Sequence, residues 1–459
     1  MPHSRLMMPG FLPPSGLRGA PFPSFLDPQR VQVFSLLAQL EETQWWTPEQ
    51  LRAHQLVQLQ ELVRHAARTT RYGRAKFPDL AQGTLTWERW AKLPILTRAT
   101  IQARRRALIS EAPPKEHGNG APARTSGSTG TPVVVERTGL TGLVWQAINA
   151  RDILWHGRDP SQTLAVIRHA PEAAGDGIRV RGWSSSARLL APPGPVEVLH
   201  IDATTEEQLV WLQGRDFEYL HVYPSGLRDL LDLAAIRGVR FPKLRAVTTF
   251  SEIVTSDLRE QLRETWGVPL QDLYSSQEMG YLALQCPEHD WYHVQSESAL
   301  VEVLREDGTP CDAGEPGRVV VTALHNFAMP LIRCDIQDFA VPGPPCPCGR
   351  ALPVLERILG REHQTFVTAG GDKVWLTIGV HLFRTLGPVR QHQLVQHRPG
   401  QLEVRLVPRR PPTPGEEGAL LAHVRANVPE GTEVTLNWVD AIPRTAMGKH
   451  LDFLSLIPR

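Results

Sequence analysis

A loop rich in glycine and hydroxyl side chains spans Thr125 to Pro132 and reads Thr-Ser-Gly-Ser-Thr-Gly-Thr-Pro. Its glycines let the backbone approach an anion closely, and its hydroxyls donate hydrogen bonds without carrying charge. The extended run Val133-Val134-Val135 follows at once. The loop can therefore surround the oxygens of a triphosphate, although a flexible Ser/Gly surface turn has the same composition. It is not a Walker loop, because no Gly-Lys-Ser/Thr ends it and no helix clearly opens after it.

Cysteines and histidines form a second group with the chemistry of metal ligands. The tight pair Cys346-Pro347-Cys348 can put two thiolates on one ion. Cys286 and one histidine, His289 or His293, can complete a tetrahedral zinc site. A closed site with four such ligands is structural rather than catalytic. The alternative is a set of reduced, buried cysteines with exposed histidines.

Length, charge and cysteine usage limit the class of protein. The 459 residues are 41% hydrophobic, which is enough for a large core and more than one domain. The 49 Lys and Arg residues balance 48 Asp and Glu residues, so the chain lacks the basic excess of a nucleic-acid-binding protein. Five cysteines argue against a disulfide scaffold, and Cys311 and Cys334 are expected to be ordinary core or turn thiols.

No apolar stretch approaches the roughly 20 residues that a membrane span needs. The start of the chain, Met1 to Pro23, is rich in Pro, Gly and Ser and lacks the charged and apolar regions of a signal peptide. We therefore expect a cytoplasmic protein, a monomer or homodimer, without nucleic-acid or membrane partners.

The elements that position the candidate residues alternate along the chain. Apolar runs of strand length lie at Thr163–Ile167, Val196–Ile201, Leu220–Tyr223, Arg245–Phe250 and Arg318–Ala323. Helical patterns lie at Glu49–Arg68, Thr205–Leu212, Gly226–Ile236 and Ser256–Trp266. This alternation predicts a large α/β domain with a mostly parallel sheet.

A smaller unit follows, with strands expected at Gln393–Gln396, Gln401–Val407 and Glu433–Val439 and a helix at Glu416–Val428. The fold class is therefore α/β, with a large mixed N-terminal domain and a small, mobile α+β C-terminal domain. We expect a loose tail over residues 1–30, the large domain over 31–360 and the small lid domain over 361–459.

Further motifs follow the glycine-rich loop in succession. They read Leu220-His221-Val222-Tyr223-Pro224-Ser225, Thr249-Phe250-Ser251-Glu252, Tyr274-Ser275-Ser276-Gln277-Glu278, Ile332-Arg333-Cys334-Asp335-Ile336-Gln337-Asp338, Ile358-Leu359-Gly360-Arg361 and Pro443-Arg444-Thr445-Ala446-Met447-Gly448-Lys449. The ordered set resembles the motifs of the adenylate-forming enzymes, the acyl-CoA synthetase superfamily, over nearly the whole chain. Within that superfamily the chain resembles the phenylacetate-CoA ligase group, on the residues Arg71-Tyr72, Leu93–Thr97, Cys286 and Cys346–Arg350.

The resemblance implies a site for magnesium-ATP. The phosphate loop would bind ATP through Ser126, Gly127, Ser128, Thr129, Gly130 and Thr131, of which Thr129 is also a catalytic candidate. Glu278 would ligate magnesium, because an acidic side chain beside a triphosphate is unfavourable without a cation between them. A solvated turn residue is the structural alternative for Glu278.

The nucleoside would lie between three further groups. Ser251, Glu252 and Ile253 would wall the adenine, and Tyr274, followed by Ser275 and Ser276, would stack on it. Asp338 would accept hydrogen bonds from both ribose hydroxyls, with Asp335 as its rival, and Arg361 suits ribose or phosphate. Core packing is the alternative role for Tyr274.

Lys449 is the expected catalytic lysine. A carboxylate that attacks the α-phosphate builds up negative charge on both partners, and a cation that contacts both offsets it. Because Lys449 lies near the C-terminus, movement of the small domain must deliver it. The acid, an aromatic one by resemblance, would bind near His221, Tyr223 and Tyr281. The resemblance also favours His293 over His289 as the zinc ligand.

The chain departs from the family pattern after Gly360-Arg361, where His363 replaces the usual hinge Asp unless Glu362 substitutes for it. The glycine that admits the pantetheine thiol is Gly370 or Gly371. The expected activity is therefore an AMP-forming acid–thiol ligase that uses ATP, magnesium and CoA. An adenylating enzyme with an amine, hydroxyl or carrier-protein acceptor and a non-catalytic nucleotide-binding protein are the alternatives.

Overall fold

The structure, a computed structural model, describes residues 11–13, 15–124, 133–361, 366–374, 376, 378, 382–443, 445 and 450–457. The predicted phosphate loop, the hinge residues Glu362 and His363, and Lys449 lie outside these residues. Of Arg361, only the backbone is described.

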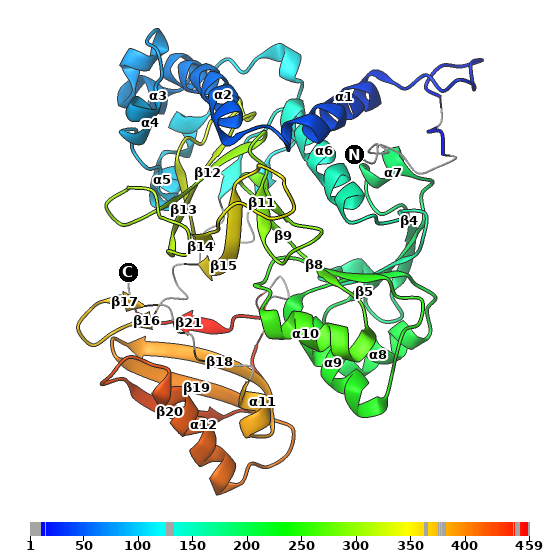
Figure 1. Cartoon of the computed structure of the whole chain (residues 1–459), viewed down its shortest axis with the longest axis vertical. Coiled ribbons are helices and arrows are strands. Elements are labelled where there is room, and N and C mark those ends of the chain that lie inside the picture. The colour runs from blue at the N-terminus through cyan, green and yellow to red at the C-terminus, as the bar shows by residue number, and fades with distance from the viewer. Residues whose placement is uncertain are drawn as a thin grey trace.

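A layer of helices forms one end of the molecule (Figure 1). It contains α1 (Pro28–Thr43), α2 (Pro48–Thr69), α3 (Arg71–Lys76), α4 (Trp87–Ala91) and α5 (Arg98–Leu108), with 3-10 turns at Pro78–Ala81 and Lys115–His117. α2 confirms the predicted amphipathic helix: Thr47 and Gln50 form a capping box at its start, and Leu59, Leu62 and Val63 are buried on its inner face. The long helix α6 (Gly139–Trp155) packs against α1.

A six-stranded sheet has the order β4-β5-β3-β6-β7-β8 and is parallel except at β4. Its strands are β3 (Leu164–Arg168), β4 (Ile178–Arg181), β5 (Pro195–His200), β6 (Tyr219–Val222), β7 (Ala246–Thr249) and β8 (Leu270–Gln271). The helices α8 (Thr205–Gln213), α9 (Pro224–Arg237) and α10 (Ser256–Trp266) share one apolar core with it, while α7 (Ala187–Leu190) and a 3-10 turn at Pro171–Ala173 lie in its connections. The four strands and three helices predicted in this region are thus confirmed within one or two residues.

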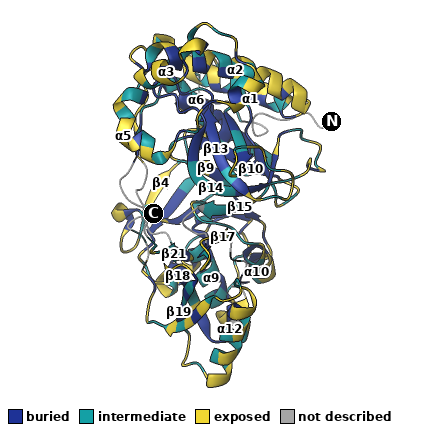
Figure 2. Cartoon of the chain, turned by 90° about the vertical axis from the view of Figure 1, so that its left-hand side faces the viewer, coloured by how far each residue is buried: buried dark blue, intermediate teal, exposed yellow. Residues whose placement is uncertain are grey.

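A seven-stranded antiparallel sheet occupies the centre of the molecule, with the order β12-β13-β14-β15-β11-β10-β9. It consists of β9 (Leu273–Ser276), β10 (Gly280–Gln285), β11 (Tyr292–Val294), β12 (Ala299–Leu304), β13 (Gly317–Ala323), β14 (Cys334–Pro342) and β15 (Val354–Arg361). The predicted strand at Arg318–Ala323 is β13, so it belongs to this sheet and not to the parallel one. In Figure 2 these strands are largely buried, whereas the outer faces of α1 and α2 are exposed.

Asp272 joins the two sheets at one point. Its carboxylate accepts hydrogen bonds from Thr249 Oγ1 (2.9 Å), at the end of β7, and from Tyr292 Oη (2.7 Å), on β11. Burial raises the pKa of Asp272 to about 6, although both hydrogen bonds and the charge of Arg259 act in the opposite direction. The hydrogen bonds of the buried Asp272 therefore hold the end of β7 beside the start of β9.

The C-terminal residues form a separate four-stranded sheet with the order β20-β19-β18-β21. Its elements are β18 (Val389–Arg398), β19 (Gln401–Pro408), β20 (Glu433–Trp438) and β21 (Phe453–Ser455), covered by α11 (Phe383–Leu386) and α12 (Pro414–Ala426), with the hairpin β16 (Phe366–Val367) and β17 (Lys373–Val374) beside them. This sheet lies at the opposite end from the N-terminal helices, next to α9 and α10 (Figure 1). Among the described residues, none of the helices combines the length and the apolar character that a membrane crossing needs.

Candidate active site

The predicted phosphate loop connects two short strands. β1 (Ala123–Arg124) pairs with β2 (Val134–Val135), and Arg124 lies opposite Val134. The chain therefore enters and leaves the loop at neighbouring points. The strand expected after the loop is confirmed, and the following helix, α6, begins only at Gly139.

The predicted adenine wall begins where β7 ends, at the carboxyl edge of the parallel sheet. Ser251 has a φ of 69°, a left-handed conformation that is uncommon for residues other than glycine. The next residue, Glu252, accepts hydrogen bonds from the backbone N–H (2.9 Å) and Oγ (3.2 Å) of Ser225 at the start of α9. Backbone strain of this kind is concentrated at ligand sites, and the adenine-binding role of Ser251 stays a prediction.

Tyr274 and Asp338 meet in the structure, although 64 residues separate them. The Tyr274 hydroxyl donates to Asp338 Oδ2 at 2.8 Å, and Asp338 lies opposite Arg361 in the β14–β15 pair. The rival Asp335 has other partners: it accepts from the backbone N–H of Gln337 (2.8 Å) and pairs with Arg318 (3.5 Å). Tyr274, Asp338 and the backbone of Arg361 are therefore the predicted residues that come together here.

Glu278 occupies the tight turn between β9 and β10, where Ser276 Oγ accepts from the backbone N–H of Met279 at 3.0 Å. Ser275, on the same hairpin, lies opposite Tyr281. A guanidinium nitrogen of Arg98 lies 3.4 Å from Glu278 Oε1, and both side chains are more than four-fifths buried. The carboxylate is thus held in place rather than solvated.

Two arginines at this turn were missed by sequence reasoning. Arg98 starts α5, directly after the string Leu93–Thr97, which pairs with β14 through Leu96. Arg137 donates to the Gln277 carbonyl and stacks on Trp145 with its guanidinium carbon 4.0 Å from the ring centroid. Burial lowers the pKa of Arg137 to about 10, while the nearby Glu278 raises it. The available signal was position: Arg98 directly follows the string Leu93–Thr97, and Arg137 lies five residues after the phosphate loop.

The three predicted acid-binding residues fall into two groups. His221 stacks on Phe250 at a centroid distance of 4.3 Å, and Tyr223 lies 4.3 Å from the same ring. The Tyr281 hydroxyl accepts a hydrogen bond from Asn149 Nδ2 (3.1 Å) instead. The charges of Asp152 and Arg158 affect the pKa of both His221 and Tyr281.

We predict that His221→Gln makes stability less sensitive to acid. Burial lowers the pKa of His221 to about 4, so the unfolded chain binds a proton there between about pH 6.5 and pH 4 while the folded chain does not. Stability therefore falls as the pH drops through this window, and removing the imidazole should reduce proton uptake on unfolding by up to one proton. Urea unfolding at pH 7 and pH 5 measures the change, with the exposed His54→Gln as control. An unchanged pH dependence would contradict the prediction.

Four of the predicted metal ligands lie within one cluster. The ligand atoms of Cys286, His293, Cys346 and Cys348 all lie within 4.8 Å of one another. The Cys346 and Cys286 sulfurs are 3.8 Å apart, and Cys348 Sγ is 3.3 Å from His293 Nε2. His289 is also close, with Nδ1 3.5 Å from Cys346 Sγ, but it is not part of the four-atom cluster. These distances match a tetrahedron with Zn–S bonds of about 2.3 Å, whose sulfur–sulfur edges are about 3.8 Å.

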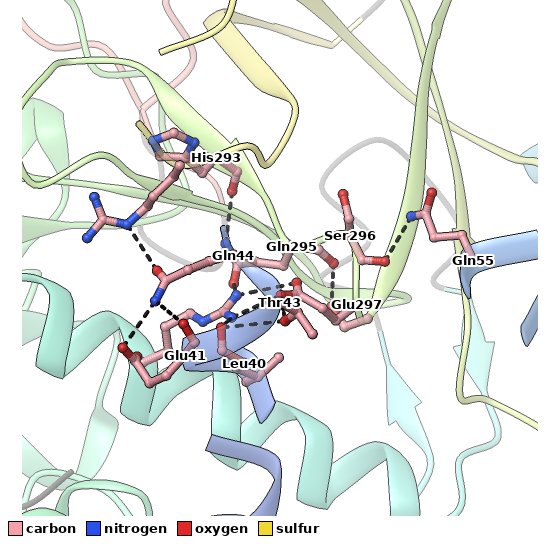
Figure 3. A network of polar contacts seen from close by, with 12 residues as sticks. Leu40, Glu41, Thr43, Gln44, Gln55, His293, Gln295, Ser296 and Glu297 are labelled. Carbon is pink, nitrogen blue, oxygen red and sulfur yellow. Dashed lines mark hydrogen bonds and ion pairs between the residues drawn. The ribbon is translucent and has the colours of Figure 1, made fainter. Parts of the chain in front are cut away.

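His293 also begins a segment that anchors the N-terminal helices (Figure 3). Its carbonyl accepts from Gln295 Nε2 (2.9 Å), and the carbonyl of Ser296 accepts from Gln55 on α2 (2.8 Å). The buried Arg151 pairs with Glu297 (2.9 Å), which also accepts from Thr43 at the end of α1 (2.6 Å). The cluster is therefore built into the contact between α1, α2, α6 and the central sheet.

Comparisons with known proteins place this geometry in context. No family model matches the chain. The chain is 26% identical over 286 residues to a phenylacetate-coenzyme A ligase of Thermus thermophilus, a match that covers 61% of this chain and 63% of that protein. It is 27% identical over 293 residues to the phenylacetate-coenzyme A ligase of Escherichia coli, with the same coverage. The chain thus spans just under two thirds of the length of these two curated relatives.

The fold has relatives among solved structures. A crystal structure of 2-hydroxyisobutyryl-CoA ligase in the postadenylation state is 17% identical, covers 90% of each chain and has a TM-score of 0.67. A crystal structure of an anthranilate CoA ligase with anthranoyl-AMP covers 72% of this chain and 65% of its own, with 16% identity and a TM-score of 0.52. The expected resemblance is therefore confirmed: the sequence is similar to phenylacetate-coenzyme A ligases, and the fold is similar to that of solved acyl-CoA ligases of the adenylate-forming superfamily.

Proposed function

We propose that this protein is an ATP-dependent, AMP-forming ligase that adenylates a carboxylic acid and transfers the acyl group to CoA. The main support for the proposal is the hydrogen bond of 2.8 Å between the Tyr274 hydroxyl and Asp338. Asp338 lies opposite Arg361 in the β14–β15 pair. An aromatic ring beside an acidic acceptor suits a nucleoside, and the backbone of Arg361 lies on the neighbouring strand. The buried Asp272 contacts Thr249 two residues before Ser251, which brings the proposed adenine wall to the same edge.

In the first half-reaction a carboxylate oxygen attacks the α-phosphorus of ATP, and pyrophosphate leaves with the electrons of the broken P–O bond. Lys449 would contact both the carboxylate and the α-phosphate, and the loop residues 126–131, Thr129 among them, would hold the phosphates. Arg98 and Arg137 place two further positive charges beside Glu278. Charge on the departing pyrophosphate can be offset there.

Magnesium fits the turn between β9 and β10. Glu278 supplies a carboxylate oxygen, the hard donor that Mg²⁺ prefers, and its position is already held by Arg98. The ion would supply charge neutralisation of the phosphates, whereas the residues around it orient the reacting groups.

In the second half-reaction the CoA thiol loses its proton and attacks the acyl carbonyl, and AMP leaves.

The acid we propose is aromatic, because His221, Tyr223 and Phe250 form an aromatic cluster and the two curated relatives are named phenylacetate-coenzyme A ligases. The proposal includes the substrate-binding roles of His221, Tyr223 and Tyr281. It also includes a cytoplasmic location and domain boundaries after residues 30 and 360.

A structural zinc is also part of the proposal. Cys286, His293, Cys346 and Cys348 offer three sulfurs and one imidazole nitrogen at tetrahedral spacing, which is the ligand chemistry of a closed zinc site. The site would stabilise the contact between the N-terminal helices and the central sheet.

Pyrophosphate exchange over a panel of carboxylic acids tests the activity. We expect ATP labelling to depend on an aromatic acid, and AMP release to depend further on CoA. If no acid supports exchange although ATP binds, the protein is a nucleotide-binding protein rather than a ligase. If exchange occurs but CoA does not release AMP, the acceptor is a different nucleophile.

A further inference from the structure

One face of α9 makes the polar contacts that hold the C-terminal sheet. Asp232 pairs with Arg409 at 2.6 Å, and Asp229 Oδ2 accepts from Gln391 Nε2 at 3.0 Å. Asp229 and Asp232 are one helical turn apart, so both lie on the same side of α9. These contacts join the parallel-sheet region to the start of β18 and the end of β19.

The Asp232–Arg409 pair is preorganised on both sides. Asp232 is 14% exposed, and its other carboxylate oxygen accepts from Gln261 Nε2 on α10 at 2.8 Å. Arg409 follows β19 directly, and its backbone N–H donates to the Pro388 carbonyl at 2.7 Å. A pair whose partners are already oriented loses less side-chain entropy than a pair of free surface residues.

A third contact reaches the segment that carries the catalytic lysine. Glu252 Oε1 accepts a hydrogen bond from the backbone N–H of His450 at 2.7 Å, while Ser225 holds the same carboxylate from α9. The His450 ring reaches back to the His392 carbonyl on β18 at 2.9 Å. These contacts anchor the residue that directly follows Lys449 in the chain beside the proposed adenine wall.

We infer that these contacts form a latch that orients the C-terminal sheet for acid adenylation, with Glu252 as the positioning residue for Lys449. The inference rests on the proposed function. The latch consists of Asp232–Arg409, Asp229–Gln391 and Glu252–His450, and its last two pairs line a groove between the two units. Glu252 thus connects the proposed nucleotide edge to the segment that follows Lys449.

The chemistry of the latch suits a contact that must also open. Partly exposed ion pairs and hydrogen bonds can exchange their partners for water at small net cost, whereas a large apolar interface cannot. The C-terminal sheet can therefore leave α9 between the two half-reactions without exposing its own core, which is formed separately by β18, β19, β20 and α12.

Charge reversal tests the latch. Asp232→Arg and Arg409→Asp are each expected to slow pyrophosphate exchange about three- to tenfold, and the double variant, which restores the pair in reverse, is expected to recover to within about twofold of wild type. Thiol-dependent AMP release from preformed acyl-adenylate should keep its wild-type rate. Asp216→Arg is the matched control, because it breaks an ion pair with Lys243 (2.8 Å) on the same unit but away from the C-terminal sheet.

Glu252→Ala tests the positioning role. It should lower kcat for adenylation by a larger factor than it raises the KM for ATP, since Glu252 anchors the lysine segment in addition to its place in the proposed adenine wall. A rise in KM with unchanged kcat would assign Glu252 to the adenine wall alone and overturn its positioning role.

A second measurement tests the latch independently of the proposed ligase function. Small-angle scattering of the unliganded protein should show a wider distribution of dimensions for Asp232→Arg than for wild type or Asp216→Arg, whether or not the protein adenylates an acid. If no acid supports exchange in wild type, the ligase proposal fails and scattering alone decides the latch. Unchanged scattering and exchange in both single variants, or an equal loss in both half-reactions, would overturn the latch.

Discussion

Lys449→Ala is expected to lower pyrophosphate exchange about 100- to 1,000-fold, the usual consequence of removing one donor that stabilises transition-state charge. The proposed adenylation joins two negatively charged groups, so a single cation in contact with both has a large effect on its rate. The anchor at His450 supports this role, because Glu252 holds the next residue beside the proposed nucleotide edge. Exchange assays at saturating ATP and acid provide the measurement.

The same variant should bind ATP nearly as well as wild type, which calorimetry can establish. Lys243→Ala is the matched control, since Lys243 is an exposed lysine that contacts Asp216. Exchange within a few-fold of wild type in Lys449→Ala would show that another group performs this role.

Cys346→Ser is expected to abolish metal binding and to lower the thermal stability of the protein at the same time. Freshly purified wild type should contain about one zinc per chain, and the variant should contain almost none, because metal binding at such a site is coupled to folding. A metal present at 100 to 1,000 times its dissociation constant stabilises the folded state by about 2.7 to 4.1 kcal/mol. Elemental analysis and thermal unfolding measure the two effects.

Two matched variants sharpen this test. Cys311→Ser alters a thiol outside the cluster and should keep the zinc. His293→Ala should lose the zinc, whereas His289→Ala should keep it, because only His293 belongs to the group of four ligand atoms. Wild-type protein without zinc, or zinc retained in Cys346→Ser, would refute the site.

Individual helices and strands could be predicted where the local pattern of apolar residues determines the structure. β3, β5, β6 and β7 are largely buried parallel strands and therefore appear in the sequence as short, mostly apolar runs. α1 is not among the predicted elements, and its apolar residues lie on more than one face: Val33 is fully buried, whereas Val31 is 50% exposed. The seven-stranded antiparallel sheet was also missed, because its strands are joined through distant pairs such as β11 with β15.

The sequence by itself determined the residue types from which the chemistry is proposed: a hydroxyl-rich loop, the order of the motifs, the cysteine pair and the proposed catalytic lysine. Only the tertiary structure decided which side chains meet. It brought Arg98 to Glu278, Tyr274 to Asp338, and His293 into one group of four ligand atoms with the three cysteines. The physical reason is that residue type and periodicity are local properties, whereas these contacts depend on strand order and register between segments far apart in the chain.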